Sequence, residues 1–118
     1  MRLRYKLWIE HESLGKAFGD GPLEILDRVD ASGSLSRAAE DMGMSYSHAW
    51  NLVRRLERAL GFSLLERQPG GGQGGGSAVT PMAREIMRRY RAFREEAAKS
   101  LQGLYHEAFD GFDWPELR

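Results

Sequence analysis

The chain has 118 residues, of which 17 are basic and 17 acidic, no cysteine, and 42% of its residues in the apolar class. These values describe one small soluble domain, because the chain is too short for two substantial cores. Without cysteine, disulfides, cysteine-based zinc sites, iron-sulfur clusters and thiol catalysis are excluded, and a reducing compartment fits. The apolar run after the basic N-terminus covers only residues 7–9. We therefore expect no export signal, no membrane span and a cytoplasmic location.

The balanced total charge conceals a segregation along the chain. Residues 45–61 hold three arginines and one glutamate, and residues 81–101 hold six basic and three acidic residues. Residues 21–44, in contrast, hold two basic and five acidic residues, and the tail from residue 102 is also acidic. Because the local field at a binding face attracts phosphates, the two basic segments are candidates for contact with nucleic acid.

The chain begins with a predicted strand and a predicted helix. Residues 3–10 alternate apolar and polar side chains, a period of two that is typical of a strand. Glycines between Gly15 and Gly21 then end this strand. A first helix is predicted over residues 22–30, because Pro22 stands at its start and apolar residues recur at a spacing of three.

Two further helices follow, separated by a short turn. Ser34 is a predicted N-cap of a short helix that ends at Gly43. Ser45 is a predicted N-cap of the next helix, residues 45–60, which stops at Gly61. One side of this helix is apolar and consists of Ala49, Leu52, Val53, Leu56 and Leu60.

The second half of the chain predicts a hairpin and a long helix. The hairpin strands are residues 62–67 and 78–80, joined by a glycine-rich tip. The long helix covers residues 81–102 and opens at Thr80-Pro81. Its apolar stripe consists of Met82, Ile86, Tyr90, Phe93, Ala97 and Leu101. The aromatic residues beyond it predict a short helix or a packed tail.

The order of these elements is that of a winged helix-turn-helix domain: mainly α, with a small β-hairpin wing and a long C-terminal dimerisation helix. We expect residues 1–80 to form the DNA-binding part, including the N-terminal strand. Residues 81–118 are expected to form the long helix and a tail packed on the same domain. The stripe on that helix is longer than the small domain could cover, which favours a homodimer.

The helix at 45–60 would then be the recognition helix, since the major groove admits one α-helix. Short polar side chains at its start would reach base edges, and at least one arginine would pair with phosphate, the others being salt-bridged or solvated. Trp50 either packs at the domain edge or touches DNA, and His48 is either a pH-sensitive reader or an ordinary surface histidine. The candidate DNA-binding residues, wing included, are Ser45, Tyr46, Ser47, His48, Trp50, Asn51, Arg54, Arg55, Arg67 and Gln73.

Other chemistries have little support in the sequence. No second ligand stands at metal spacing from His48, so we expect no metal site. The glycine tract lacks the Gly-Lys-Ser or Gly-Lys-Thr ending of a phosphate loop, and it is either a flexible tip or a backbone contact to DNA. No nucleophile and base stand together, so we expect no enzyme and no cofactor.

Three segments resemble the N-terminal domain of the molybdate-responsive regulator ModE, over about residues 20–100. They are Ser34-Leu35-Ser36-Arg37-Ala38-Ala39, Met44-Ser45-Tyr46-Ser47-His48-Ala49-Trp50, and the glycine wing leading to Ala78-Val79-Thr80. A broader pattern is similar to the DNA-binding domain of LysR-type regulators: Ala38-Ala39, Val53-Arg54-Arg55-Leu56-Glu57, Leu60-Gly61, Leu64-Leu65-Glu66-Arg67 and Thr80-Pro81.

This resemblance implies a homodimer that binds operator DNA and regulates transcription. In the ModE family separate C-terminal domains bind molybdate, so no molybdate site is expected in this chain. The related wing carries a basic residue among its glycines where this chain has Gln73, which implies weaker contact between the wing and phosphates. The alternative is a protein-interaction or nonspecific DNA-binding module on the same scaffold, with the long helix and the aromatic tail recruiting a partner.

Overall fold

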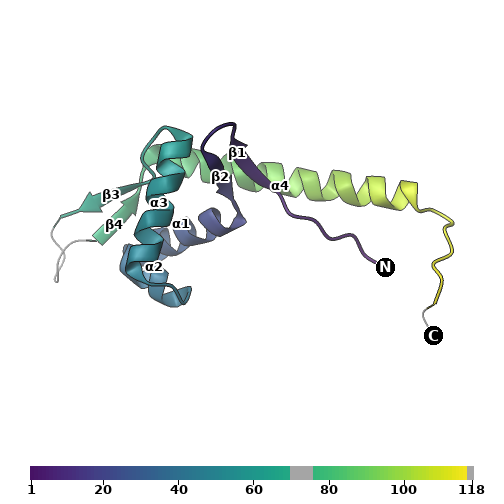
Figure 1. Ribbon diagram of the computed structural model, residues 1–118, viewed down its shortest axis with the longest axis horizontal. Helices are drawn as coiled ribbons and strands as arrows, with labels where there is room; N and C mark the ends of the chain where they lie inside the picture. The colour runs from purple at the N-terminus through teal and green to yellow at the C-terminus, as the bar shows by residue number, and fades with distance from the viewer. Residues whose placement is uncertain (70–75, 117–118) are drawn as a thin grey trace.

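The computed structural model describes residues 1–69 and 76–116, and Gln73 lies outside the described residues. Three helices form a body beside which the long fourth helix runs and then continues alone, while one hairpin projects as a wing (Figure 1). This arrangement confirms the predicted winged helix-turn-helix fold. In chain order the elements are β1 (Trp8–His11), β2 (Gly15–Gly19), α1 (Asp20–Ser32), α2 (Leu35–Asp41), α3 (Tyr46–Leu60), β3 (Leu65–Gln68), β4 (Gly76–Val79) and α4 (Pro81–Ala108).

The helix boundaries follow local capping chemistry. The Ser34 hydroxyl accepts a hydrogen bond from the backbone N–H of Arg37 at 3.0 Å, and Ser45 does the same for His48 at 3.1 Å. Both predicted N-caps are therefore confirmed. Gly61 ends α3 with φ 85°, in the left-handed region that glycine adopts without strain.

The predicted N-terminal strand, residues 3–10, is wrong over residues 3–7 and confirmed over residues 8–10, where β1 begins. The structure has no regular element over residues 1–7, and the strand β1 pairs antiparallel with β2, which the sequence analysis did not predict. The alternating pattern over residues 3–7 has no partner strand, and a strand needs one to satisfy its backbone groups. Gly15 does not end a strand but opens β2 after a turn, with φ 84°.

The wing strands lie a few residues from their predicted positions. β3 pairs antiparallel with β4 from Leu65 opposite Val79 to Gln68 opposite Gly76. The second strand stops before Thr80, because the Thr80 hydroxyl accepts from the backbone N–H of Ala83 and so caps α4. The same hydroxyl donates to the Ser63 carbonyl at 2.7 Å, which ties the start of the wing to the start of α4.

The core lies where α1, α2 and α3 meet β2 and the first half of α4. Burial of these side chains removes apolar surface from water and is the main stabilising contribution to the fold. The largest side chains that are fully buried are Phe18, Ile25, Leu26, Val29, Val53, Leu56 and Leu64.

The predicted apolar stripe of α4 is wrong at its first member. Ala83, Met87 and Tyr90 face the core, whereas Met82 is 54% exposed. Thr80 and β4 fix the start of the helix and therefore its rotation, so that the core side begins one residue later. The Tyr90 ring packs edge-on against Phe18 at 5.2 Å between centroids. The helix also extends to Ala108, beyond the predicted end at residue 102.

None of the helices among residues 1–69 and 76–116 combines the length and the apolar content that crossing a bilayer requires.

Candidate nucleic-acid interface

The helix α3 divides into a buried face and an exposed polar face. Ala49, Val53, Leu56 and Ala59 are buried against the core. The opposite face carries hydrogen-bonding and basic groups, and it is open to solvent over the whole helix. Its exposed members are Tyr46, Ser47, His48, Trp50, Asn51, Arg54, Arg55 and Arg58.

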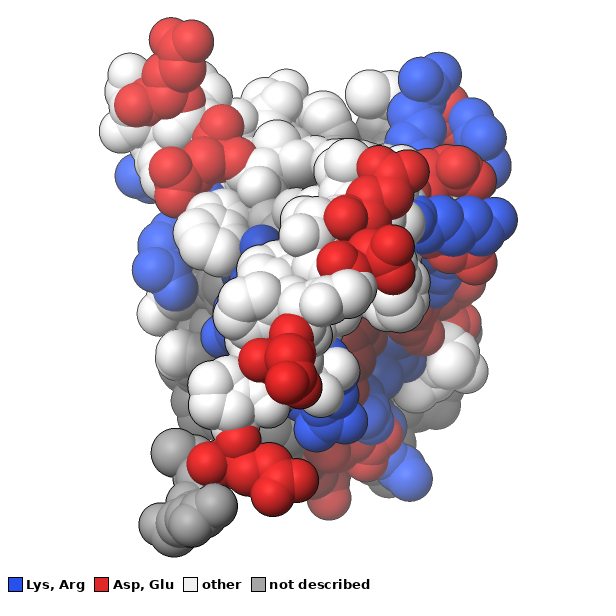
Figure 2. Space-filling model, turned by 90° about the vertical axis from the view of Figure 1, so that its right-hand side faces the viewer, with Lys and Arg blue, Asp and Glu red and all other residues white. Residues whose placement is uncertain are grey.

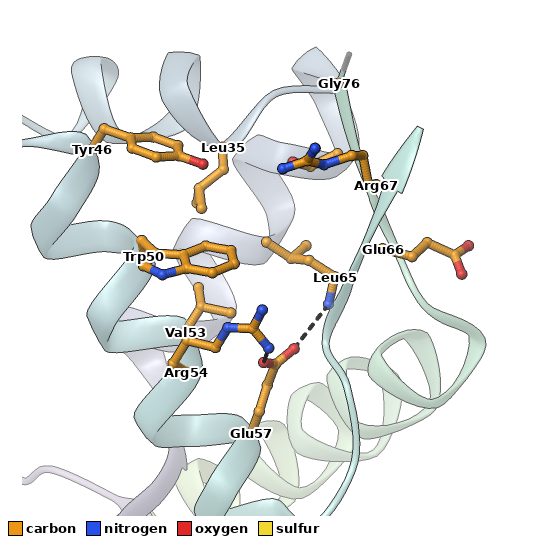
Figure 3. Close-up of a pocket in the computed structure, with 11 residues that line it drawn as sticks. Leu35, Tyr46, Trp50, Val53, Arg54, Glu57, Leu65, Glu66, Arg67 and Gly76 are labelled. Carbon is orange, nitrogen blue, oxygen red and sulfur yellow. Dashed lines mark hydrogen bonds and ion pairs between the residues drawn. The ribbon is translucent and has the colours of Figure 1, made fainter. Parts of the chain in front are cut away.

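A cleft of about 180 Å³ separates this face from the wing (Figure 3). Tyr46, Trp50 and Arg54 line it from α3, and Arg67 lines it from β3. Figure 3 shows the Arg67 side chain reaching across the cleft toward α3. The structure therefore brings four of the predicted residues together around one concave surface.

Inside this cleft, Trp50, Arg54 and Glu57 form a connected group. The Arg54 guanidinium carbon lies 4.2 Å from the centroid of the Trp50 ring, a cation–π contact. The same guanidinium pairs with Glu57 at 3.2 Å. Arg54 is thus one of the salt-bridged arginines that the sequence analysis allowed for, and Trp50 is 39% exposed beneath it.

Glu57 also connects α3 to the wing. Its second oxygen accepts from the backbone N–H of Leu64 at 2.7 Å, just before β3 begins, and its side chain is only 12% exposed. No role could be predicted for Glu57, because its partner lies seven residues away in a turn whose course depends on the tertiary fold. One carboxylate therefore fixes both the Arg54 side chain and the first residues of the wing.

The far strand of the wing is held by the turn between α1 and α2. The Ser77 backbone N–H donates to the Gly33 carbonyl at 2.8 Å. A Cβ atom on Gly76 would lie 2.4 Å from that carbonyl oxygen, so only glycine fits there without a shift. The described part of the wing is thus anchored to α3, to α4 and to the turn before α2.

The remaining predicted residues that the structure describes lie on α3 or at its N-cap, outside the cleft. The Ser45 hydroxyl oxygen accepts from His48 N–H as the helix cap, and its hydrogen is left to donate. Ser47, His48 and Asn51 are exposed in the first two turns, and Arg55 is exposed on the next turn. Among the described residues, Arg55 forms no ion pair with a carboxylate.

The arginines of α4 have a different environment. Arg84 pairs with Asp30 at 2.7 Å and Arg94 with Asp20 at 3.0 Å, and a further ion pair joins Arg91 to α1. The hydrogen bond from Arg84 lowers the pKa of Asp30 below its ordinary value. These ion pairs place the basic side of α4 against the acidic side of α1.

At the end of this series, Asp20 and Tyr90 interact directly. The Tyr90 hydroxyl lies 2.9 Å from Asp20 Oδ1 and 3.1 Å from the Leu7 carbonyl. Burial and the hydrogen bond to Asp20 raise the pKa of Tyr90 to about 12. Burial alone would raise the pKa of Asp20, but the hydrogen bonds from Arg94 and Tyr90 outweigh it and leave this pKa lowered.

Within residues 1–69 and 76–116, no three side chains of the metal-binding types lie close enough together to hold a metal ion.

A helix-turn-helix whose second helix exposes a polar and basic face, with a β-hairpin beside it, defines the winged helix-turn-helix class of DNA-binding domains. The family model described as "Bacterial regulatory helix-turn-helix protein, lysR family" matches residues 22–84. The chain therefore belongs to the LysR family of bacterial regulatory helix-turn-helix proteins. The match covers α2, α3 and the wing.

Several curated proteins are similar to this chain. "Molybdenum transport protein ModE" of Azotobacter vinelandii is 33% identical over 91 residues, which cover 77% of this chain and 34% of that protein. "Molybdenum-pterin-binding protein MopB" of Rhodobacter capsulatus is 32% identical over 79% of this chain and 34% of its own length. "DNA-binding transcriptional dual regulator ModE" of Escherichia coli K12 is 32% identical over 70% of this chain and 31% of its own length. The chain thus spans about a third of these relatives, and the resemblance to ModE and LysR-type regulators is confirmed.

Proposed function

We propose that the chain is a sequence-specific DNA-binding regulator of transcription that acts as a homodimer. The observation that carries this proposal is the exposed polar and basic face of α3, capped at its start by Ser45 and flanked by the anchored wing. A helix presented in this way fits the major groove, and a wing beside it lies close to the phosphodiester backbone. The family match and the name of the Escherichia coli relative support the same function.

The side chains of α3 have two kinds of role in this proposal. Ser47, His48 and Asn51 are short, exposed and located in the first turns, so we assign base contacts to them. Arg55 is exposed one turn later, so we assign it a phosphate contact. Arg54 and Trp50 form the wall of the cleft nearest the wing, where Arg67 is the second basic group.

The homodimer is proposed from the second half of α4. From Phe93 onward, the helix carries apolar side chains that no element of the described chain covers, including Phe93 at 49% and Leu104 at 61% exposed. Packing of this face against a second copy would bury it, in the isologous manner of twofold dimers. Two recognition helices could then enter successive major grooves about 34 Å apart.

The experiment that tests the proposal is selection of bound sequences from a random duplex library, with the oligomeric state measured by light scattering. Enrichment of a twofold-symmetric motif is the expected result, and the genes beside genomic copies of that motif show whether the targets concern molybdenum. The same binding measurement with added molybdate tests the expectation that this chain has no molybdate site. We expect its affinity for DNA to stay unchanged. No enrichment by a folded dimer would contradict sequence-specific binding.

Two substitutions separate the assigned roles. Arg55→Ala should weaken binding to all sequences and reduce the slope of log affinity against log salt by about 1, because one phosphate contact is lost. Ser47→Ala should instead change the base preferred at one position of the motif. Arg89→Ala is the matched control for Arg55, since it removes an exposed arginine from α4 rather than from α3. Equal effects of the two arginine substitutions would contradict the assignment of α3.

The second candidate is a protein-interaction module. The observation that favours it is the exposed aromatic cluster at the end of α4, with Phe112 at 54% exposure. Absence of binding to random-sequence DNA at low salt would shift the interpretation to this candidate.

A further inference from the structure

Residues 1–7, which we call the basic arm, carry charges that the rest of the chain does not pair. The arm has no regular secondary structure, and its basic and apolar side chains alternate. Leu3 and Leu7 are half-buried, whereas the basic side chains are exposed. Within residues 1–69 and 76–116, none of these basic side chains forms an ion pair. They are Arg2, Arg4 and Lys6.

The basic arm and the start of α3 lie on the same side of α4. The arm leaves the body beside Tyr90, whose hydroxyl lies 3.1 Å from the Leu7 carbonyl, and it extends toward the C-terminal end of α4 (Figure 1). In this view the arm, α2 and the start of α3 all lie below α4, whereas the turn between β1 and β2 lies above it (Figure 1). The side of the molecule that presents the start of α3 to DNA therefore also presents the arm.

The proposed homodimer places both arms near its twofold axis. The axis of an isologous dimer passes through the interface. The proposed interface is the uncovered part of α4 from Phe93 onward, and the arm extends along this part from Tyr90. The wing lies at the other end of the molecule (Figure 1). In the dimer, the two arms therefore lie between the two copies of α3, and the wings lie outside them.

The part of the duplex that faces the twofold axis is a minor groove. Two copies of α3 in successive major grooves are one helical turn, about 34 Å, apart. Halfway between them the duplex has completed half a turn, so it presents its minor groove to the protein. This groove is about 6 Å wide, too narrow for a helix, but extended arms that carry arginine enter it. The basic arm has the composition and the extended form that this groove admits.

The arm is also long enough for this contact. A fully extended chain spans about 3.3 Å per residue, so the six residues before Leu7 span roughly 20 Å. The molecule measures 32 and 25 Å across its long axis. The arm can therefore span most of the depth of the body, from α4 to the side on which α3 meets the DNA.

The end of α4 and the tail after it supply little positive charge near the twofold axis. Residues 95–116 contain six carboxylates and one lysine. Figure 2, which faces this end of the molecule, shows a broad uncharged surface with acidic groups on it and basic groups mainly toward its edges. Phosphates beneath this surface would be repelled unless basic groups lie between. The arm carries such groups on the required side of α4.

We infer that the basic arms of the two protomers enter the minor groove between the half-sites and form a DNA contact additional to those of α3 and the wing. Arg2 and Arg4 lie in the groove, and Lys6, nearer the body, pairs with a phosphate. This contact depends on the proposed function and extends it to the centre of the binding site. A·T pairs should be preferred there, because they narrow the minor groove and strengthen its negative potential, whereas a G·C pair adds an amino group to it.

Modified DNA tests the groove. The selected motif is prepared with A·T pairs at its centre and, separately, with diaminopurine in place of the central adenines. Diaminopurine adds an amino group in the minor groove and leaves the major-groove edge unchanged. The wild type should bind the modified duplex roughly tenfold more weakly, a cost similar to that of one mismatched pair. The arm variant, which carries Arg2→Ala, Arg4→Ala and Lys6→Ala, should bind both duplexes equally.

Salt dependence tests the charges. The arm variant should reduce the slope of log affinity against log salt by about 2 or more, because at least one phosphate contact is lost from each of two arms. Lys99→Ala is the matched control. Lys99 lies on the same stretch of α4, but two and a half turns after Tyr90 and so on the opposite face, and its loss should leave the slope unchanged. The arm variant should dimerise like the wild type in sedimentation equilibrium, because it retains Leu3 and Leu7.

Tethered cleavage locates the arm on the DNA. The chain has no native cysteine, so Tyr5→Cys carries an iron–EDTA reagent at one position of the arm without removing a charge. Both strands should be cut at the centre of the motif. Ser13→Cys is the control that should leave the centre uncut, because the β1–β2 turn lies on the other side of α4 (Figure 1).

The outcomes separate the arm contact from the proposed function. A selected motif that tolerates diaminopurine at its centre, or that the reagent on Tyr5→Cys does not cut there, overturns the arm contact and leaves sequence-specific binding by α3 in place. An arm variant that no longer dimerises also overturns it, because the charges would then serve the dimer interface. Failure to select any motif contradicts the proposed function, and the arm contact with it.

Discussion

The contact between Gly76 and the turn before α2 can be tested by a single methyl group. In Gly76→Ala the added Cβ would start 2.4 Å from the Gly33 carbonyl oxygen, closer than carbon and oxygen atoms approach without bonding. Both groups belong to the backbone, so no side chain can move aside. Either β4 or the α1–α2 turn has to shift by several tenths of an ångström.

The expected loss of stability follows from two contributions. Overpacking of a fixed contact costs about 1–3 kcal/mol. The shift also lengthens the hydrogen bond from Ser77 N–H to the Gly33 carbonyl, now 2.8 Å, and a bond of this kind contributes about 0.5–1.5 kcal/mol. We therefore expect the free energy of unfolding to fall by about 2–3 kcal/mol, and Tm to fall by on the order of 10 °C for a domain of this size.

Thermal and urea denaturation followed by circular dichroism measure this loss. Gly103→Ala is the matched control, because Gly103 lies inside α4 and a Cβ there would meet no atom within 4 Å. That substitution should raise the stability by about 0.5–1 kcal/mol, since alanine has the higher helix propensity. The two alanine substitutions should thus change the free energy of unfolding in opposite directions. If Gly76→Ala unfolds like the wild type, the described packing of the wing on the α1–α2 turn is wrong.

Three further substitutions test individual interactions. Glu57→Gln should lower the free energy of unfolding by about 1 kcal/mol, because a neutral amide replaces the charged acceptor of the Leu64 N–H. Glu57→Ala should lower it further. Equal stability of the wild type and both variants in urea would contradict the role of Glu57 as this acceptor. The folded-state pKa of Tyr90 is raised to about 12, so the contribution of Tyr90 to stability is complete below the ordinary value of 10.0 and is lost as the pH rises toward 12. The difference in stability between wild type and Tyr90→Phe should therefore shrink over that range. A difference that stays constant would refute this prediction. The pKa of Asp30 is lowered, so the contribution of Asp30 to stability is present above the ordinary value of 3.8 and is lost as the pH falls through the folded-state pKa. Asp30→Asn should therefore be less stable than wild type at neutral pH but equal to it in strong acid. Urea midpoints measured across this pH range test the prediction.

The elements that could be predicted from the sequence are those governed by local chemistry. Ser34 and Ser45 cap helices because a hydroxyl at that position satisfies an N–H two or three residues later, which requires no tertiary information. Gly61 ends α3 for an equally local reason, since its φ of 85° is strained for other residues. These local signals located α2 and α3 and therefore the candidate DNA-binding face.

The elements that could not be predicted depend on contacts distant in sequence. The alternation over residues 3–7 is as regular as that of a strand, but β2 is only five residues long and pairs no further back than Trp8. Glu57 is an ordinary polar residue of α3 by sequence, and only the path of the chain after Gly61 brings the Leu64 N–H to its carboxylate. The rotation of α4, which decides whether Met82 or Ala83 is buried, likewise depends on where Thr80 is held.

Which arginines keep a free charge also depends on contacts that are distant in sequence, and this matters for the proposed function. The basic segment 81–101 and the acidic segment 21–44 were separate features of the sequence, and both basic segments were candidates for nucleic acid. In the structure Arg84 and Arg94 pair with carboxylates of α1, so much of this charge is neutralised where two helices pack. The arginines of the basic segment 45–61 are in a different position, because no carboxylate of α1 pairs with the exposed face of this segment. Within residues 1–69 and 76–116, Arg55 and Arg58 of α3 form no ion pair, whereas all five arginines of α4 do, and this difference supports the proposal that α3 rather than α4 faces the phosphates.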